Sequence, residues 1–146
     1  MKKKEGFLNM WIIYGLLSAI LAALTSILAK IGMDNVNSNL ATAIRTVVVL
    51  VMAWIVVGVT KTAGGITQLT RANWIFLILS GIATGASWLF YYKAIQIGEV
   101  SKVVPLDKLS IVFVFIFSVL VLKEPISLKT LIGIGLITLG TLVLTL

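Results

Sequence analysis

The residues best suited to do chemistry are charged side chains that stand inside or at the ends of long apolar runs. They are Lys30, Arg45, Lys93, Asp107 and Lys108. Charged side chains at membrane depth are costly, and they usually face the interior of a helix bundle or a water-filled path. We expect such residues to select a solute by its charge, to form ion pairs that open and close and, at Asp107, to couple movement to a proton.

Each of these residues also has a simpler interpretation. Lys30 and Lys93 end apolar runs, where lysine often does no more than reach the lipid head groups. Arg45 and Lys108 lie deeper, which favours a position facing a cavity or the bundle interior. Asp107 is the one acid expected inside the membrane. It can be read as the partner in an ion pair with Arg45 or with a lysine on another helix. The alternative is a site that a substrate or a proton engages. A simple pair with Lys108 is not expected, because adjacent residues on a helix point away from each other.

Several kinds of site are excluded by composition. The chain has no cysteine and no histidine, so disulfides, thiol chemistry and the commonest metal ligand are absent. No nucleophile–base pair, metal set or phosphate-binding loop stands out, so we expect neither an enzyme nor a cofactor. The net charge of +7 would suggest nucleic acid in a soluble protein. In a membrane protein it fits cytoplasmic anchoring and anionic lipid head groups, and no nucleic-acid partner is expected.

The elements that must position the charges are membrane-spanning helices. Hydrophobic residues make up 60% of the chain and charged residues 12%, in apolar blocks that approach the roughly 20 residues needed to cross a bilayer. Residues 1–146 are therefore predicted to form a single all-α integral membrane domain. A cleaved signal peptide is not expected, because the first run, 11–29, is long and four similar runs follow. The five predicted helices are 10–33, 40–59, 74–95, 101–122 and 126–146.

The short apolar parts of the second and fourth helices place charges inside the membrane. The uninterrupted runs 46–59 and 109–122 each cover about 21 Å at 1.5 Å per residue, less than the roughly 30 Å of a hydrocarbon core. To span, the second helix must draw in Arg45 and the fourth must draw in Asp107 and Lys108. With the ends of the first and third helices, these positions fall on one side of the bilayer. A polar layer in one half of the bundle is therefore predicted.

Small and aromatic residues add two further candidate sets. Gly81 and Gly85 form a GxxxG pair, a pattern that lets membrane helices approach closely, within the monomer or in a dimer. Gly133 and Gly140 lie one heptad apart on the last helix, where dimerisation is a specific possibility. Aromatic residues near helix ends, Tyr92 among them, are interpreted as interfacial anchors. Two of them lie within a turn of Lys93 and are either anchors or walls of a cavity: Trp88 and Tyr91.

Two local signals concern helix ends. Asn37, Ser38 and Asn39 are potential N-caps of the second helix. Pro105 lies in the first turns of the fourth helix and removes one backbone hydrogen bond beside Asp107. Such a weakened helix start suits a hinge or a binding site, although proline near an N-terminus is often only tolerated.

The stretch from Phe90 to Ser110 resembles the junction between the third and fourth helices of EamA-type proteins, in the drug/metabolite transporter superfamily. The stretches 123–127 and 132–140 are similar to the last helix of that family's repeat. Family members usually carry two such units in an inverted repeat of ten helices. This sequence resembles a single unit. The resemblance therefore implies a half-transporter that must pair to enclose a pathway and that moves a small solute by alternating access.

The related small multidrug exporters differ from this chain in charge. They resemble four-helix units with a glutamate in the first helix, whereas the run from Met10 to Met33 here contains no acid. The predicted interior is net positive, which favours an anionic or zwitterionic solute over a cationic drug. Two alternatives remain open: a non-transporting membrane subunit of a larger complex, and a lipid-linked sugar flippase.

The distribution of basic residues bears on orientation in the cytoplasmic membrane. Seven lie on the side of the amino terminus and five on the other. Loop charges alone predict a cytoplasmic amino terminus, which leaves a parallel dimer or an oppositely oriented partner chain. The total of seven against five also permits both orientations, and an antiparallel homodimer would rebuild ten helices. We expect that homodimer, in the lipid bilayer and with a small-molecule substrate.

Overall fold

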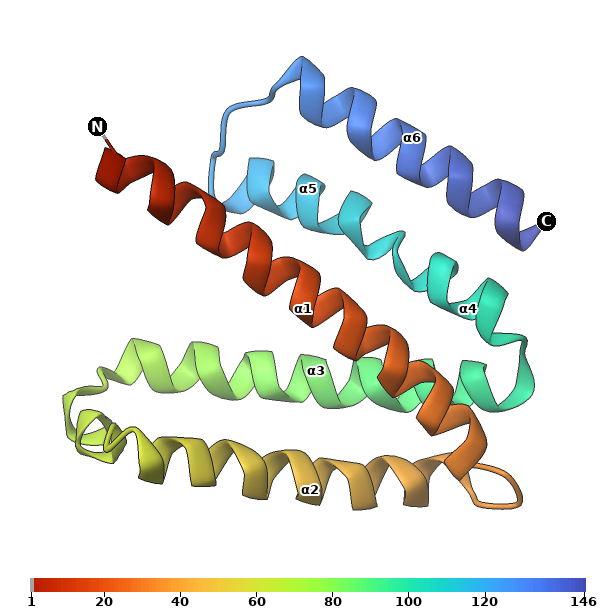
Figure 1. The fold of residues 1–146 in the computed structure, drawn as a ribbon, viewed down its shortest axis with the longest axis horizontal. Coiled ribbons are helices and arrows are strands. Elements are labelled where there is room, and N and C mark those ends of the chain that lie inside the picture. The colour runs from red at the N-terminus through yellow and green to blue at the C-terminus, as the bar shows by residue number, and fades with distance from the viewer. Residues whose placement is uncertain (1) are drawn as a thin grey trace. The chain divides into compact units, whose positions relative to one another are not determined.

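The computed structural model describes the backbone of residues 2–146 and the side chains of residues 10–146, and it contains no strand in that range (Figure 1). The described residues form six α-helices and one 3-10 helix. They are α1 (Lys2–Gly32), α2 (Ser38–Val59), η1 (Ala63–Gln68), α3 (Arg71–Ile97), α4 (Val100–Asp107), α5 (Ser110–Val121) and α6 (Leu128–Thr145).

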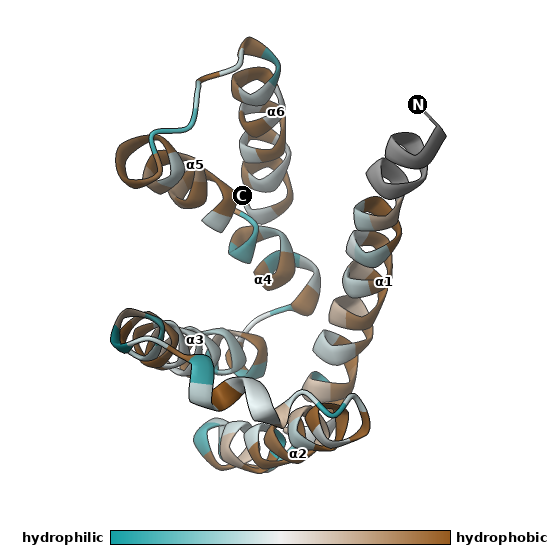
Figure 2. Ribbon diagram, turned by 90° about the vertical axis from the view of Figure 1, so that its left-hand side faces the viewer, coloured by the Kyte–Doolittle hydropathy of each residue, from teal (hydrophilic) through white to brown (hydrophobic). Residues whose placement is uncertain are grey.

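Five segments are long and apolar enough to cross a membrane, which confirms the prediction of an all-helical protein with five spans. They are Met10–Gly32, Ser38–Val59, Arg71–Ile97, Val100–Val121 and Leu128–Thr145. Hydrophobic residues run along the helices (Figure 2), and most large apolar side chains are exposed, such as Leu17, Val48 and Leu139. In water such surfaces would be an aggregation hazard, whereas lipid tails or a partner helix can cover them.

Side-chain caps explain where two of the helices begin. The Asn37 carboxamide oxygen accepts a hydrogen bond from the Asn39 amide at 2.9 Å, so α2 begins at Ser38 rather than at residue 40. The Thr70 hydroxyl oxygen accepts from the Asn73 amide at 3.2 Å, so α3 begins at Arg71 rather than at residue 74. Both bonds satisfy amides that have no partner within the helix.

The segment predicted as one helix, residues 101–122, divides into α4 and α5. Between them, the amides of Lys108 and Leu109 bond three residues back, to the carbonyls of Pro105 at 2.9 Å and Leu106 at 3.1 Å. Lys108 accordingly has φ −69° and ψ −11°, close to the 3-10 conformation. Pro105 lacks an amide hydrogen and its ring crowds the turn before it, so its direct effect falls within α4 and not at the turn at Lys108. The two helices still form one candidate span.

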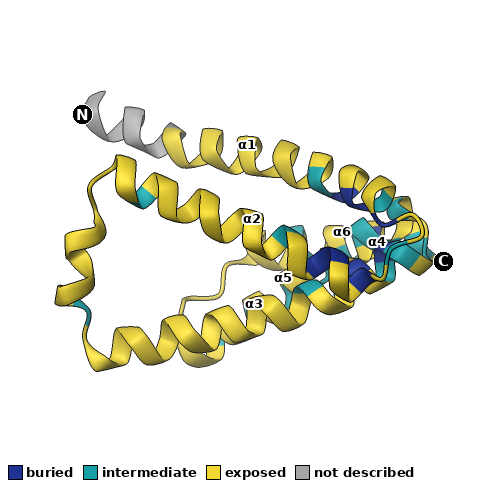
Figure 3. Cartoon of the chain, turned by 90° about the horizontal axis from the view of Figure 1, so that it is seen from below, coloured by how far each residue is buried: buried dark blue, intermediate teal, exposed yellow. Residues whose placement is uncertain are grey.

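The chain comprises two compact units. The hairpin unit is residues 32–97, in which α2 packs against α3. The discontinuous unit combines residues up to 31 with residues 98–146, and in it α6 packs mainly against α4 and to a lesser extent against α5. Buried side chains of the hairpin unit gather where α2 begins and α3 ends (Figure 3), among them Ala41, Tyr92 and Ile95.

Several threonine hydroxyls within the spans are bonded to their own helices. Thr42 donates to the Ser38 carbonyl at 2.7 Å, Thr84 to Ser80 at 2.9 Å, and Thr138 to Ile134 at 2.8 Å. This is the usual way in which a hydroxyl is satisfied in a helix interior.

Candidate functional site

The centre of the hairpin unit is a contact between Arg45 of α2 and Tyr92 of α3. The guanidinium Nη2 of Arg45 donates a hydrogen bond to the Tyr92 hydroxyl oxygen at 2.7 Å. The guanidinium carbon also lies 4.2 Å from the centroid of the same ring, within the range of a cation–π interaction. Tyr92 is buried, with 4% of its surface exposed. Arg45 is therefore held against the neighbouring helix and does not simply extend toward the head groups.

Two further aromatic rings pack around Tyr92. The Tyr91 ring lies edge-on at a centroid distance of 5.3 Å, and the Trp88 ring lies edge-on at 6.5 Å. Such T-shaped pairs match the positive edge of one ring to the negative face of another. Trp88 and Tyr91, predicted as anchors or cavity walls, thus belong to the aromatic cluster that holds Arg45. Whether they line a path for solute stays a prediction.

The Lys93 side chain bonds to a residue of its own helix, α3. Its ammonium donates to the side-chain oxygen of Gln96 at 3.4 Å, and Lys93 is exposed. Gln96 in turn donates to the Val36 carbonyl at 2.6 Å, which ties the end of α3 to the turn before α2. Lys93 therefore lies beside the Arg45–Tyr92 contact in sequence but makes a different contact.

Lys30 ends α1 in the discontinuous unit. Its ammonium donates to the Gly98 carbonyl at 2.9 Å. The contact joins the last turn of α1 to the start of the segment that leads into α4. This bond gives Lys30 a structural role within its unit, in addition to any role in a path.

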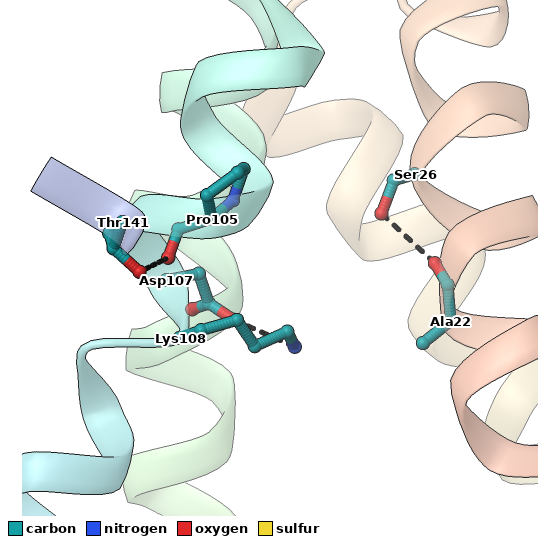
Figure 4. A network of polar contacts seen from close by, with 6 residues as sticks. All are labelled: Ala22, Ser26, Pro105, Asp107, Lys108 and Thr141. Atoms are coloured by element: carbon teal, nitrogen blue, oxygen red, sulfur yellow. Dashed lines mark hydrogen bonds and ion pairs between the residues drawn. The ribbon is translucent and has the colours of Figure 1, made fainter. Parts of the chain in front are cut away.

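Asp107 and Lys108 form an ion pair, contrary to the expectation that they would point apart. The Lys108 nitrogen lies 3.6 Å from a carboxylate oxygen of Asp107 (Figure 4). The expectation assumed a regular α-helix at both positions. Because α4 ends at Asp107 and Lys108 lies in the 3-10 turn, the two side chains can meet. Their side chains remain 40% and 59% exposed, respectively.

The turn that carries this pair is bonded to α6. The hydroxyl of Thr141, a buried residue, donates to the Pro105 carbonyl at 3.4 Å (Figure 4). That carbonyl also accepts from the Lys108 amide. On α1, the Ser26 hydroxyl donates to the Ala22 carbonyl at 3.0 Å, a bond within its own helix. The Pro105 turn thus has an interhelical hydrogen bond from a residue four positions before the end of α6.

The four glycines singled out for packing are open within their own units. A methyl group added at any of them would meet no atom of the chain within 4 Å. They are Gly81, Gly85, Gly133 and Gly140. Close helix packing at these glycines inside a unit is therefore not what the structure shows. Dimerisation through them stays a prediction.

The predicted charged residues fall into two groups. Arg45 and Lys93 belong to the hairpin unit, while Lys30, Asp107 and Lys108 belong to the discontinuous unit. Of these, the structure brings Asp107 and Lys108 together. The single polar layer through all five residues stays a prediction. Among the described residues, no cluster of three or more acidic side chains could hold a metal ion.

Two residues of the site were missed by sequence reasoning. Tyr92 was taken for an interfacial anchor, and Thr141 was not singled out. A signal for Tyr92 was present, since it adjoins Lys93, which was placed in the same polar layer as Arg45, and a membrane arginine needs a polar partner. No comparable signal points to Thr141, because its partner is a backbone carbonyl.

Taken together, the described side chains can bind and exchange charged groups. Arg45 offers a held guanidinium, and Asp107 with Lys108 offers a local pair that can open. Whether these groups bind a solute stays a prediction.

Comparisons with known proteins agree on one family. A family model described as "EamA-like transporter family" matches residues 9–146. The chain is 46% identical, over 134 residues, to a Sinorhizobium sp. protein named "Uncharacterized transporter in cobO 3'region"; the alignment covers 92% of this chain and 95% of that protein. No solved structure matches the chain.

Proposed function

The chain belongs to the EamA-like transporter family, and from that premise we propose that it is one half of a dimeric transporter. In this proposal the dimer carries a small anionic or zwitterionic solute across the cytoplasmic membrane by alternating access. The family is one of transporters and not of enzymes. The chain is accordingly a multi-pass membrane protein with a solute as its substrate.

The number of spans supports a half-transporter. Five candidate spans are one unit of the two-unit, ten-helix arrangement that the family resemblance implies. The Sinorhizobium relative is matched over 95% of its own length, so it too has the size of one unit. A second copy in the opposite orientation would supply the inverted repeat. The exposed apolar surfaces of the helices provide area for such pairing.

The balance of charges within the spans carries the proposal of an anionic or zwitterionic solute. The five spans contain one acid, Asp107, and it is already paired with Lys108. The spans of the hairpin unit contain no acid at all, yet they hold Arg45 and Lys93. A cationic solute entering this region would meet repulsion, whereas a carboxylate or phosphate would be attracted.

Transport can be tested in proteoliposomes with three labelled solutes of similar size. Benzoate is anionic, phenylalanine is zwitterionic and phenethylamine is cationic. We expect saturable uptake of the first two and little uptake of the third. Uptake of phenethylamine alone would overturn the assignment of charge. No uptake of any solute, followed by activity when a partner membrane protein is added, would identify a subunit and contradict a homodimeric transporter.

A further inference from the structure

Arg45 carries a charge that no acid of its unit neutralises. It lies seven residues after the start of α2, about 10 Å along the helix. The hairpin unit has a single acid, Asp34, which lies in the turn before α2 and is exposed. Among the described residues, the structure records no ion pair for Arg45. A buried or partly buried guanidinium without a counter-ion is costly, unless a ligand supplies the charge.

At the Arg45–Tyr92 contact, several N–H and O–H donors have no recorded acceptor among the described residues. A guanidinium has five N–H donors, and one is recorded in use, on the Tyr92 oxygen. The Tyr92 hydroxyl accepts that bond, and the described residues provide no recorded acceptor for its own hydrogen. Thr42 and Thr46, near Arg45 on α2, place their hydroxyl hydrogens on the Ser38 and Thr42 carbonyls. Donors from two helices therefore lie together without an acceptor.

The same contact fixes the position of these donors before any ligand arrives. Tyr92 is 4% exposed, and its ring meets the edges of Tyr91 and Trp88. The Arg45 guanidinium lies 4.2 Å from the centre of that ring. Rotamer freedom has thus already been lost, which lowers the entropic cost of binding.

We propose that Arg45 and Tyr92 form a binding site for the carboxylate of a monoanionic solute whose body is apolar. The site rests on the proposed function, since it names the group by which the carried solute is recognised. A planar guanidinium matches a carboxylate through two parallel hydrogen bonds, and the Tyr92 hydroxyl adds a third donor. Trp88, partly buried and one turn before Tyr92, offers an apolar surface for the rest of the solute.

The charge at the site favours one negative charge over two. Arg45 is the one cation in contact with Tyr92. Lys93 directs its ammonium to Gln96, 3.4 Å away. A phosphate dianion would leave one charge uncompensated in a poorly solvated position, which is unfavourable. A monocarboxylate is neutralised by Arg45 alone.

The test is calorimetric binding to the purified full-length chain in detergent. The probes are benzoate, benzyl alcohol and phenyl phosphate, which share an aromatic body and differ in charge. Benzoate is expected to bind more tightly than the other two. Arg45→Gln should weaken benzoate binding roughly tenfold or more, since it removes a charged donor. Tyr92→Phe keeps the ring and removes the hydroxyl, so a loss of about fivefold is expected.

Arg71→Gln is the matched control. It removes the same charge from the same unit, at the exposed start of α3, and should leave benzoate affinity within about twofold, because screened surface charges contribute little. Each variant is first compared with the wild type by size-exclusion chromatography and circular dichroism. If Arg45→Gln does not fold, Tyr92→Phe still decides the matter.

Three outcomes would overturn the site. They are benzoate binding that is unchanged in both variants, phenyl phosphate binding tighter than benzoate, and binding of short-chain phosphatidylglycerol but not of benzoate. The last would identify Arg45 as a lipid contact. Binding in detergent needs no transport. Arg45-dependent binding without uptake by proteoliposomes would therefore contradict the proposed function alone, and uptake without such binding would contradict the site alone.

Discussion

The ammonium of Lys108 lies 3.6 Å from the carboxylate of Asp107, its neighbour in the sequence. This pair exists because the helix changes to a 3-10 turn at Lys108. The side chains of Asp107 and Lys108 are 40% and 59% exposed on the chain itself, so packing does not fix the pair. We expect that a solute or a proton can replace Lys108 as the partner of Asp107.

Asp107→Asn is expected to abolish or uncouple transport and to leave the protein folded. The substitution removes the one acid within the spans and keeps the size of the side chain. Only a small change in stability is expected, because the Asp107 side chain is not buried against other residues of the chain. Uptake by proteoliposomes, with and without a pH gradient, measures the effect. Glu99→Gln, at an acid outside the spans, is the control and should transport normally. Normal uptake by Asp107→Asn at every pH gradient would show that Asp107 has no such role.

Thr141→Val is expected to destabilise the contact between α4 and α6. The substitution removes the hydrogen bond to the Pro105 carbonyl and keeps the shape of the side chain. Interhelical hydrogen bonds in membrane proteins contribute about 0.6 kcal/mol on average, so a loss of that order is expected in unfolding by sodium dodecyl sulfate. Thr145→Val is the matched control, since Thr145 bonds to carbonyls of its own helix. Equal stability of the two variants would show that the Pro105 bond contributes nothing.

The antiparallel homodimer predicts that the chain inserts in both orientations. Reporters fused at Lys61 and at the carboxyl terminus should each be detected on both sides of the membrane, because seven and five basic residues nearly balance. Lys102→Gln removes an exposed charge from the side with five. It should shift the population toward a cytoplasmic amino terminus. A carboxyl terminus found on one side only in the wild type would rule out the antiparallel homodimer.

Lys61→Gly is expected to stabilise the end of α2. Lys61 has φ of 54°, in the left-handed region that favours glycine. The Thr62 amide bonds to the Val57 carbonyl and the Lys61 amide to that of Gly58, the bonding of a Schellman motif, in which glycine is preferred at this position. Relief of the strain should add about 1 kcal/mol to the free energy of unfolding. Lys61→Ala removes the same charge but keeps Cβ, so it should not be stabilising. Equal stability of the two variants would argue against strain at Lys61.

The sequence was most informative about spans and least informative about contacts between them. Apolar length alone predicted five membrane helices, because the bilayer imposes that length. Asn37 was among the predicted N-caps because capping depends on local chemistry. The 3-10 turn at Lys108 was not predicted, since it follows Pro105, whereas a proline is expected to disturb the turn before it. Tyr92 was misassigned because a tyrosine is equally suited to the membrane interface and to bonding an arginine. Which of the two it does depends on Arg45 of a neighbouring helix, which the local sequence does not reveal.

The hydroxyl bonds within the helices bear on how the chain enters the bilayer. Thr42, Thr84 and Thr138 turn their hydroxyl hydrogens inward to carbonyls of the preceding turn. To surrounding acyl chains Thr84 and Thr138 then present mainly a methyl group, much as valine does, while Thr42 is buried within the chain. These spans should partition from the insertion machinery into lipid more readily than their threonine content suggests. The chain can therefore keep polar groups near Arg45 without weakening the insertion of the helix that carries it.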